Sequence, residues 1–186
     1  MQDWLIAPCA PSDIEAVAEL VNSAYRGDTA RTGWTHEADY IGGQRTSAAD
    51  LAAELAANPA STLLALRKAD DGDILACVMV ERVDGSDGRR AGYIGMLTVR
   101  PDLQADGLGR VLLEAAEQYA RRDGADRARL TVVSIRESLI AWYVRRGYAL
   151  TGETRPFPYD DQRFGEPRRD DLEFVVLEKS LTGEAA

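Results

Sequence analysis

A short stretch rich in small residues, 104–110 with the sequence QADGLGR, joins an apolar run to an amphipathic pattern. Apolar residues recur in this pattern at 108, 111, 112, 115, 116 and 119, which is the spacing of a helix packed on a sheet. The stretch therefore predicts a strand–turn–helix unit, with Gly124 ending the helix. Such a turn points backbone N–H groups at one spot, where the helix dipole favours negative charge. We therefore expect a phosphate site.

Three strand-like runs precede this unit, at 62–68, 74–83 and 93–99, and short Asp- and Gly-rich turns separate them. Short connections of this kind suit antiparallel hairpins. Further elements are expected in the order strand 4–7, helix from Ser12, helix from Ser47 to Asn58, strand 130–135, helix 137–146, strand 148–153 and strand 172–179. Hairpins followed by strand–helix units predict a mixed α/β fold of the α+β type.

Length and composition indicate how many domains, which location and which cysteine chemistry to expect. A chain of 186 residues, 45% of them hydrophobic, is able to bury a core as one domain, which we expect over 1–182 with a flexible tail at 183–186. The apolar runs are too short for a bilayer and the first residues lack the features of a signal peptide. We therefore expect a cytoplasmic protein with no membrane partner. Cys9 and Cys77 are far apart and predict reduced thiols without a metal.

The formal net charge of −9 disfavours a nucleic-acid partner, because the phosphate backbone would be repelled. An amine-bearing partner is easier to accommodate. This argument concerns steering and solubility and says nothing of the fold.

Three kinds of phosphate motif compete for the turn. A P-loop fails because no lysine follows the glycines, and a dinucleotide fingerprint fails because its third small position is Leu112. The third is a pyrophosphate loop of the form Arg/Gln-x-x-Gly-x-Gly/Ala, which Gln104, Gly107 and Gly109 match. Here the chain resembles the GNAT acetyltransferases. The resemblance extends from the strand 96–99 to the segment AWYVRRGY at 141–148, about the second half of the chain.

The resemblance implies a GNAT fold, with a mixed, mostly antiparallel sheet of about six to seven strands flanked by helices. It also implies acetyl-coenzyme A as the acyl donor, and no metal. The residues implied to bind this donor are Leu97, Thr98 and Val99 through their backbone, then Gln104, Ala105, Asp106, Gly107, Leu108, Gly109 and Arg110 around the pyrophosphate. Arg136 stands where many members have asparagine, and it either reaches a cofactor phosphate or is solvated at a helix start.

The same resemblance makes Tyr143 the general acid that protonates the leaving thiolate, although a tyrosine here also suits a packed core. The general base is less evident, because the strand 93–99 contains no carboxylate. Glu81 and Glu37 are the alternatives, and His36 is interpreted as a surface residue. Neither cysteine lies in the motif region, so direct transfer without an acyl-enzyme is expected.

Two long loops, 25–45 and 155–171, are the regions that the resemblance assigns to the acceptor. Trp34, Glu37, Phe157 and Tyr159 are the candidate acceptor contacts, because aromatic rings beside carboxylates are able to enclose an amine. The alternative is that the aromatic residues pack on the core or on a second subunit of a homodimer.

The leading hypothesis is an N-acetyltransferase that acts on a primary amine of a small molecule or a protein. The first alternative is a non-catalytic acyl-coenzyme A sensor that keeps the cofactor loop without a working base. The second is a structural α/β module with no affinity for the cofactor.

Overall fold

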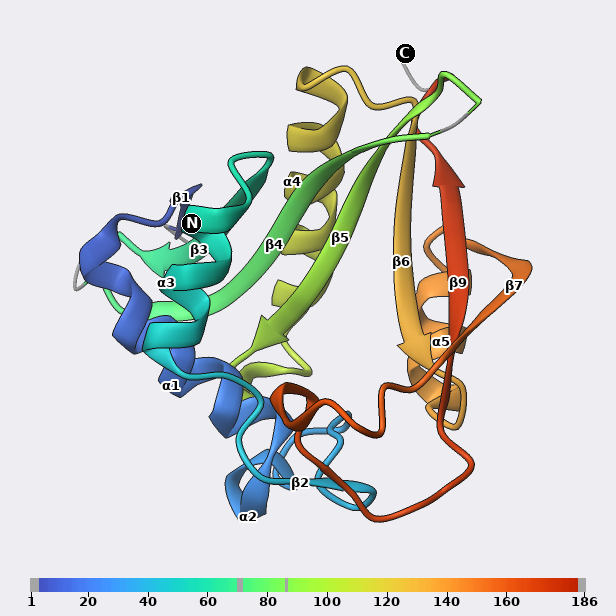
Figure 1. The fold of residues 1–186 in the computed structure, drawn as a ribbon. Helices are drawn as coiled ribbons and strands as arrows, with labels where there is room; N and C mark the ends of the chain where they lie inside the picture. The colour runs from blue at the N-terminus through green and yellow to red at the C-terminus, as the bar shows by residue number, and fades with distance from the viewer. Residues whose placement is uncertain (1–3, 70–71, 86, 184–186) are drawn as a thin grey trace.

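A computed structural model of the chain describes residues 4–69, 72–85 and 87–183. Its main sheet has the strand order β1-β3-β4-β5-β6-β9-β7 (Figure 1). These strands are β1 (Trp4–Pro8), β3 (Ser61–Lys68), β4 (Ile74–Asp84), β5 (Arg90–Val99), β6 (Arg127–Val133), β7 (Ala149–Pro156) and β9 (Glu173–Ser180). Each pair of neighbours is antiparallel except β5 and β6, which are parallel. The predicted hairpins and the predicted mostly antiparallel mixed sheet are confirmed.

Helices cover both faces of the sheet. They are α1 (Ile14–Tyr25), α2 (Gly27–Ala30), α3 (Ala48–Ala57), α4 (Leu108–Arg122) and α5 (Glu137–Val144), with 3₁₀ turns η1 (Pro11–Asp13), η2 (Pro101–Leu103) and η3 (Gln162–Phe164). The alternation along β4 shows the two faces: Cys77 and Met79 pack with α1, whereas Val78 and Val80 belong to the cluster under α4. Figure 1 shows α1 and α3 on one side of the sheet and α4 on the other.

The two loops 26–45 and 155–171 are more ordered than the sequence predicts. They contain α2, η3 and a small antiparallel sheet in which β2 (Ile41–Gly42) pairs with β8 (Glu166–Pro167). Two-residue strands made partly of Gly and Pro have no hydrophobic period, so a pattern search does not detect them. The pairing joins the two predicted acceptor loops to each other.

Several strand boundaries also differ from the prediction. β7 runs on to Pro156, three residues beyond the predicted end, and every residue in it is exposed. β6 begins at Arg127 rather than at 130, because its first arginines form ion pairs with Asp87 and Glu178 and carry no apolar signal. Of the predicted tail 183–186, the part from 184 lies outside the described residues.

Candidate active site

The central feature of the site is the place where β5 and β6 separate. The two strands pair only between residues 91–93 and 127–129, and below this point they diverge (Figure 1). A cavity of about 1250 Å³ occupies the opening. The edge of β5 from Ile94 onward therefore has no strand partner on its β6 side, and its backbone is available to an extended ligand.

A bulge in β5 lies at this opening. Cys77 pairs with Thr98 and Met79 pairs with Gly95, so that Met96 and Leu97 together face one residue of β4. Met96 has φ 52°, which is the one positive φ at a non-glycine position in the part of the chain that the structure describes. A residue other than glycine is costly in this region, and such strain is concentrated at functional sites. Leu97 lines the cavity, and bulges are a common means of re-aiming a residue at an active site.

The turn after β5 offers unpaired amide groups. Gly107, with φ 82°, caps α4 and has no Cβ that this conformation would strain. Among the described residues, no acceptor pairs with the backbone N–H of Ala105, Gly107, Leu108 or Gly109. These groups lie at the positive end of a helix of 15 residues. The arrangement is suited to bind a phosphate.

The side chains of the turn have different surroundings. Leu108 is buried in the core under α4, Asp106 is exposed outside the cavity lining, and Arg110 pairs with Glu114 at 2.9 Å. The Gln104 side chain does not face the free amides. Its Oε1 accepts a hydrogen bond from the backbone amide of Thr35 at 3.3 Å, and this bond connects the turn to the loop after α2.

A cluster of arginines faces the same end of the cavity. Arg145 and Arg146, at the end of α5, line it together with Arg110. The Arg146 guanidinium lies 3.6 Å from the ring centroid of Trp142, and its buried Nε has no partner among the described residues. Burial, followed by the charges of Arg145 and Arg110, lowers the pKa of Arg146. A bound polyanion would relieve this repulsion. Sequence reasoning missed Arg145 and Arg146 because the pair resembles an ordinary helix end.

Tyr143 lies in the cavity wall beside this cluster. Its ring packs edge-on against Trp142, with 5.0 Å between centroids, and against Tyr148, with 5.6 Å. Burial is the main cause that raises the pKa of Tyr143. Its hydroxyl makes no hydrogen bond to another described residue. The hydroxyl is therefore protonated at neutral pH and free to donate to a ligand.

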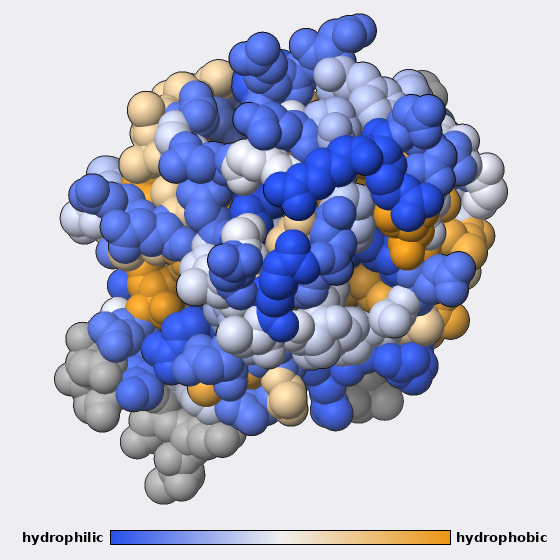
Figure 2. Space-filling view, turned by 90° about the horizontal axis from the view of Figure 1, so that it is seen from below, coloured by the Kyte–Doolittle hydropathy of each residue, from blue (hydrophilic) through white to orange (hydrophobic). Residues whose placement is uncertain are grey.

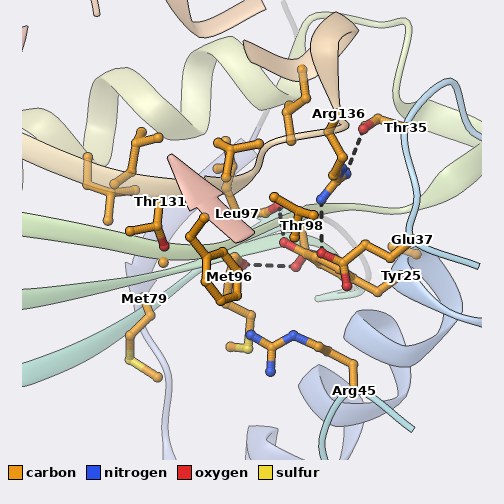
Figure 3. A pocket seen from close by; sticks show the side chains of 18 of the residues that line it. Tyr25, Thr35, Glu37, Arg45, Met79, Met96, Leu97, Thr98, Thr131 and Arg136 are labelled. Carbon is orange, nitrogen blue, oxygen red and sulfur yellow. Dashed lines mark hydrogen bonds and ion pairs between the residues drawn. The ribbon is translucent and has the colours of Figure 1, made fainter. Parts of the chain in front are cut away.

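Glu37 also lines the cavity and forms ion pairs with two arginines, Arg136 and Arg26; Figure 3 shows the contact with Arg136. Its Oε1 lies 3.1 Å from Arg136 and its Oε2 lies 3.0 Å from Arg26, and all three side chains are buried. Arg136 also donates to Oγ1 of Thr35 at 2.7 Å. Each carboxylate oxygen of Glu37 thus already forms an ion pair with an arginine. Arg26 was not singled out in the sequence, because it looks like a residue just after a helix.

The remaining candidates are distributed around the cavity. Glu81 lines it and accepts from Asn58 Nδ2 at 2.8 Å. Trp34 lines it and is 45% exposed, with its ring 6.4 Å from that of Trp142. Phe157 is buried in the lining and stacks on Phe174. Tyr159 does not line the cavity, and its hydroxyl accepts from the amide of Leu172 at 2.7 Å.

Cys9, Cys77 and His36 are not part of the cavity lining. Burial raises the pKa of Cys9 to about 11 and that of Cys77 to about 12, so both are thiols at neutral pH. The Nδ1 atom of His36 is buried without a partner in the described part of the chain. Across residues 4–69, 72–85 and 87–183 no group of three metal-ligating side chains is found, and no helix is long and apolar enough to span a membrane.

Comparison with known proteins agrees with this geometry. The mycothiol acetyltransferase of Propionibacterium freudenreichii subsp. shermanii is 31% identical over 93 residues, which are 50% of this chain. The chain spans 29% of the length of that relative.

Solved structures share the fold. The yncA protein from Salmonella typhimurium, solved with its cofactor acetyl-CoA, has a TM-score of 0.68 at 19% identity, over 98% of this chain and 96% of that one. The ribosomal-protein-S18-alanine N-acetyltransferase from Escherichia coli has a TM-score of 0.66 at 18% identity, over 98% of each chain. The family model for the acetyltransferase (GNAT) family matches residues 15–148. The chain belongs to the acetyltransferase (GNAT) family.

Proposed function

We propose that this protein is an acetyl-CoA-dependent N-acetyltransferase, which moves the acetyl group directly to a primary amine of a small molecule or a protein. The observation that carries the proposal is the continuity of the site. One cavity contains the unpaired edge of β5, the free amides of the turn and a buried tyrosine hydroxyl. These features match the three parts of the donor: its extended arm, its pyrophosphate and its thioester.

The donor fits the residues present. The free amides of Ala105, Gly107, Leu108 and Gly109 form a cradle for the pyrophosphate, and the unpartnered Nε of Arg146 supplies positive charge beside it. Leu97, Thr98 and Val99 would pair with the pantetheine arm as an added strand. When bound, the donor supplies an acyl thioester, whose carbonyl carbon is the electrophile.

Other predicted contacts take indirect roles in the proposal. Gln104 and Arg136 both bind Thr35, so we assign them to positioning the loop after α2 beside the cofactor. Asp106 and Arg110 lie at the outer rim, where solvent screens their charges.

The chemistry requires two proton transfers. As the amine nitrogen bonds to the acetyl carbon, the C–S bond breaks and the thiolate takes a proton, for which we assign the Tyr143 hydroxyl. The amine must lose a proton, and Glu81 is the preferred acceptor. Glu37 is less suited, because both of its oxygens bind arginines. Direct transfer is preferred because both cysteines lie outside the cavity lining.

The acceptor is proposed to enter between the two loops that β2 and β8 join. Trp34 and Phe157 line this region, whereas Tyr159 is proposed only as a residue that holds the loop around Phe157. We further propose a cytoplasmic location and a single domain over 1–182. A homodimer would bring a second copy to the loop 155–171.

Two measurements on the purified protein test the function. Calorimetry with acetyl-CoA measures donor binding, and thiol release with a panel of amines measures transfer. Binding with turnover on at least one amine supports the enzyme. Binding without turnover on any class of amine supports the acyl-CoA sensor, and absence of binding supports the structural module.

A further inference from the structure

Three arginines lie close together at the acceptor end of the cavity. Arg45 lies 5.8 Å from the ring centroid of Tyr25, and Arg136 lies 5.9 Å from it. Arg26, the next residue in the chain after Tyr25, also lines the cavity. The one carboxylate that forms ion pairs with these arginines, within the described residues, is Glu37.

Arg45 is the arginine left without a partner. Both oxygens of Glu37 are taken by the other two arginines, and the side chain of Arg45 forms no ion pair or hydrogen bond with any residue that the structure describes. The charge of Arg45 adds to burial in lowering the pKa of Arg26. The group therefore has excess positive charge, which favours binding of an anion.

The carboxylates nearby are engaged elsewhere. Asp50 accepts from the hydroxyl of Ser47 at 2.6 Å, and Glu81 accepts from Asn58 at 2.8 Å. Glu54 and Asp50 act instead on Arg163, across the cavity, where their charges help to raise its pKa after the closer effect of Asp161. None of these carboxylates forms an ion pair with Arg45.

Arg45 is also close to the position where transfer would occur. Figure 3 shows its side chain extending from the loop between α1 and α3 toward Met96. The hydroxyl of Tyr25, whose ring Arg45 covers, donates to the carbonyl of Leu97 at 3.2 Å. An anionic group on Arg45 would therefore lie beside the Tyr25 side chain, whose hydroxyl contacts the bulge.

This anion site differs from the cofactor's. The free amides and the arginines at the end of α5 belong to α4 and α5, which cover the face of the sheet opposite α1 and α3 (Figure 1). Arg45 lies on the α1–α3 side. The donor's phosphates and an anion on Arg45 would then occupy opposite ends of one cavity.

We propose that Arg45 binds a carboxylate of the acceptor, and that the acceptor is an amine of the amino acid class. The planar guanidinium matches a carboxylate with two parallel hydrogen bonds. The inference rests on the proposed function for its reaction, but the binding of the carboxylate is measurable without turnover.

The test compares ligands that differ only in the carboxylate. Free amino acids are paired with their amides, and each ligand is assayed for turnover with acetyl-CoA and for binding to the protein by calorimetry. The amino group of an amino acid amide is a weaker base than that of the free amino acid, so a larger fraction of it is unprotonated and able to react. An enzyme without a carboxylate site would therefore prefer the amide. Arg45→Leu removes the charge and Arg45→Lys keeps it. Arg122→Leu, at the exposed end of α4, is the matched control.

We expect the amino acid to bind about 10- to 100-fold more tightly than its amide, which is the usual strength of a hydrogen-bonded charge pair. Arg45→Leu should abolish this difference, Arg45→Lys should restore part of it, and Arg122→Leu should leave it unchanged. Acid-selective binding that depends on Arg45, without turnover of the amino acids, would uphold the anion site and refute acetyl transfer to this class of amine. Turnover that shows no preference for the acid over the amide, and that Arg45→Leu leaves unchanged, would overturn the inference and leave the enzyme standing.

Discussion

Tyr143 is a residue whose surroundings suit it to donate a proton. Tyr143 lines the cavity, and its hydroxyl is protonated and has no hydrogen-bond partner among the described residues. Tyr143→Phe removes the hydroxyl and keeps the ring contacts with Trp142 and Tyr148. We expect turnover to fall by about 10²- to 10³-fold, the range of a lost general acid. Steady-state kinetics with acetyl-CoA would measure the change.

A matched hydroxyl outside the cavity controls for packing. Tyr119 on α4 bonds to Thr62 through its hydroxyl at 3.1 Å and does not line the cavity. Tyr119→Phe should leave turnover within about twofold of the parent protein. Equal turnover in Tyr143→Phe and the parent would remove the general acid assignment.

The pH dependence of turnover follows from the same side chain. An ordinary tyrosine loses its proton near pH ~10. Burial raises the pKa of Tyr143, so its acidic form persists to higher pH than usual. Turnover should rise as the amine is deprotonated, and loss of the Tyr143 proton should cause no fall in turnover up to about pH 10. A fall in turnover below pH 9 that disappears in Tyr143→Phe would contradict this prediction.

Glu117 is a buried carboxylate with a structural role. It is 3% exposed, accepts from the Tyr148 hydroxyl at 2.9 Å, and pairs with Lys179 at 2.8 Å. Glu117→Ala leaves both partners unsatisfied, so the free energy of unfolding should fall by about 3 kcal/mol. Urea denaturation measures the free energy of unfolding.

Glu114→Ala is the control, because Glu114 belongs to an exposed ion pair on the same helix. It should lower the free energy of unfolding by less than about 1 kcal/mol, and equal losses in the Glu114 and Glu117 variants would refute the structural role of Glu117.

At the scale of elements, the turn between β5 and α4 places the free amides. A Cβ at Gly107 would meet no atom within 4 Å, so Gly107→Ala disturbs only the backbone at φ 82°. A non-glycine residue in this conformation costs about 1–2 kcal/mol, and relaxation of the turn would move its amides. We expect acetyl-CoA to bind about 10-fold more weakly, as measured by calorimetry.

Gly109 supplies the control for that substitution. Its added Cβ would lie 3.5 Å from the Trp142 ring and 3.6 Å from Val99, which are ordinary contacts, and its conformation is not left-handed. Gly109→Ala should therefore weaken binding less than Gly107→Ala. A larger loss of acetyl-CoA affinity in Gly109→Ala than in Gly107→Ala would show that steric fit, rather than backbone conformation, determines donor binding at the turn.

The elements differ in how far the sequence predicts them. The turn and α4 were predictable because a glycine pattern and a helical period are both local signals. The arginine bridge to Glu37 was not, because it joins Arg26, Glu37 and Arg136, whose closeness depends on tertiary packing. β7 escaped full detection for a third reason. It is an edge strand whose residues are all exposed, so it lacks the alternation that burial imposes.

For the whole molecule, net charge is a poor guide to the site. The chain has a formal charge of −9, yet in the described residues eight arginines and four carboxylates line the cavity. Figure 2, which views the molecule from below, shows a face covered mainly by hydrophilic side chains, with apolar atoms visible between them. The acidic residues lie mostly elsewhere on the surface. A positive cavity in an acidic protein attracts a polyanionic donor locally, although the global charge argues against it.

The sheet is held together weakly at its centre, which makes ligand binding a test of the whole architecture. Only three residue pairs join β5 to β6, and the cavity separates the strands below them. A donor that binds both β5 and the arginines at the end of α5 would tie the two halves together. Acetyl-CoA at 100 times its dissociation constant should add about 2.7 kcal/mol to the free energy of unfolding.

Binding of acetyl-CoA should slow amide hydrogen exchange most in β5, β6 and the turn, and least in β1, which lies at the far edge of the sheet. Greater slowing in β1 than in β5 and β6 would show that the donor binds outside this opening.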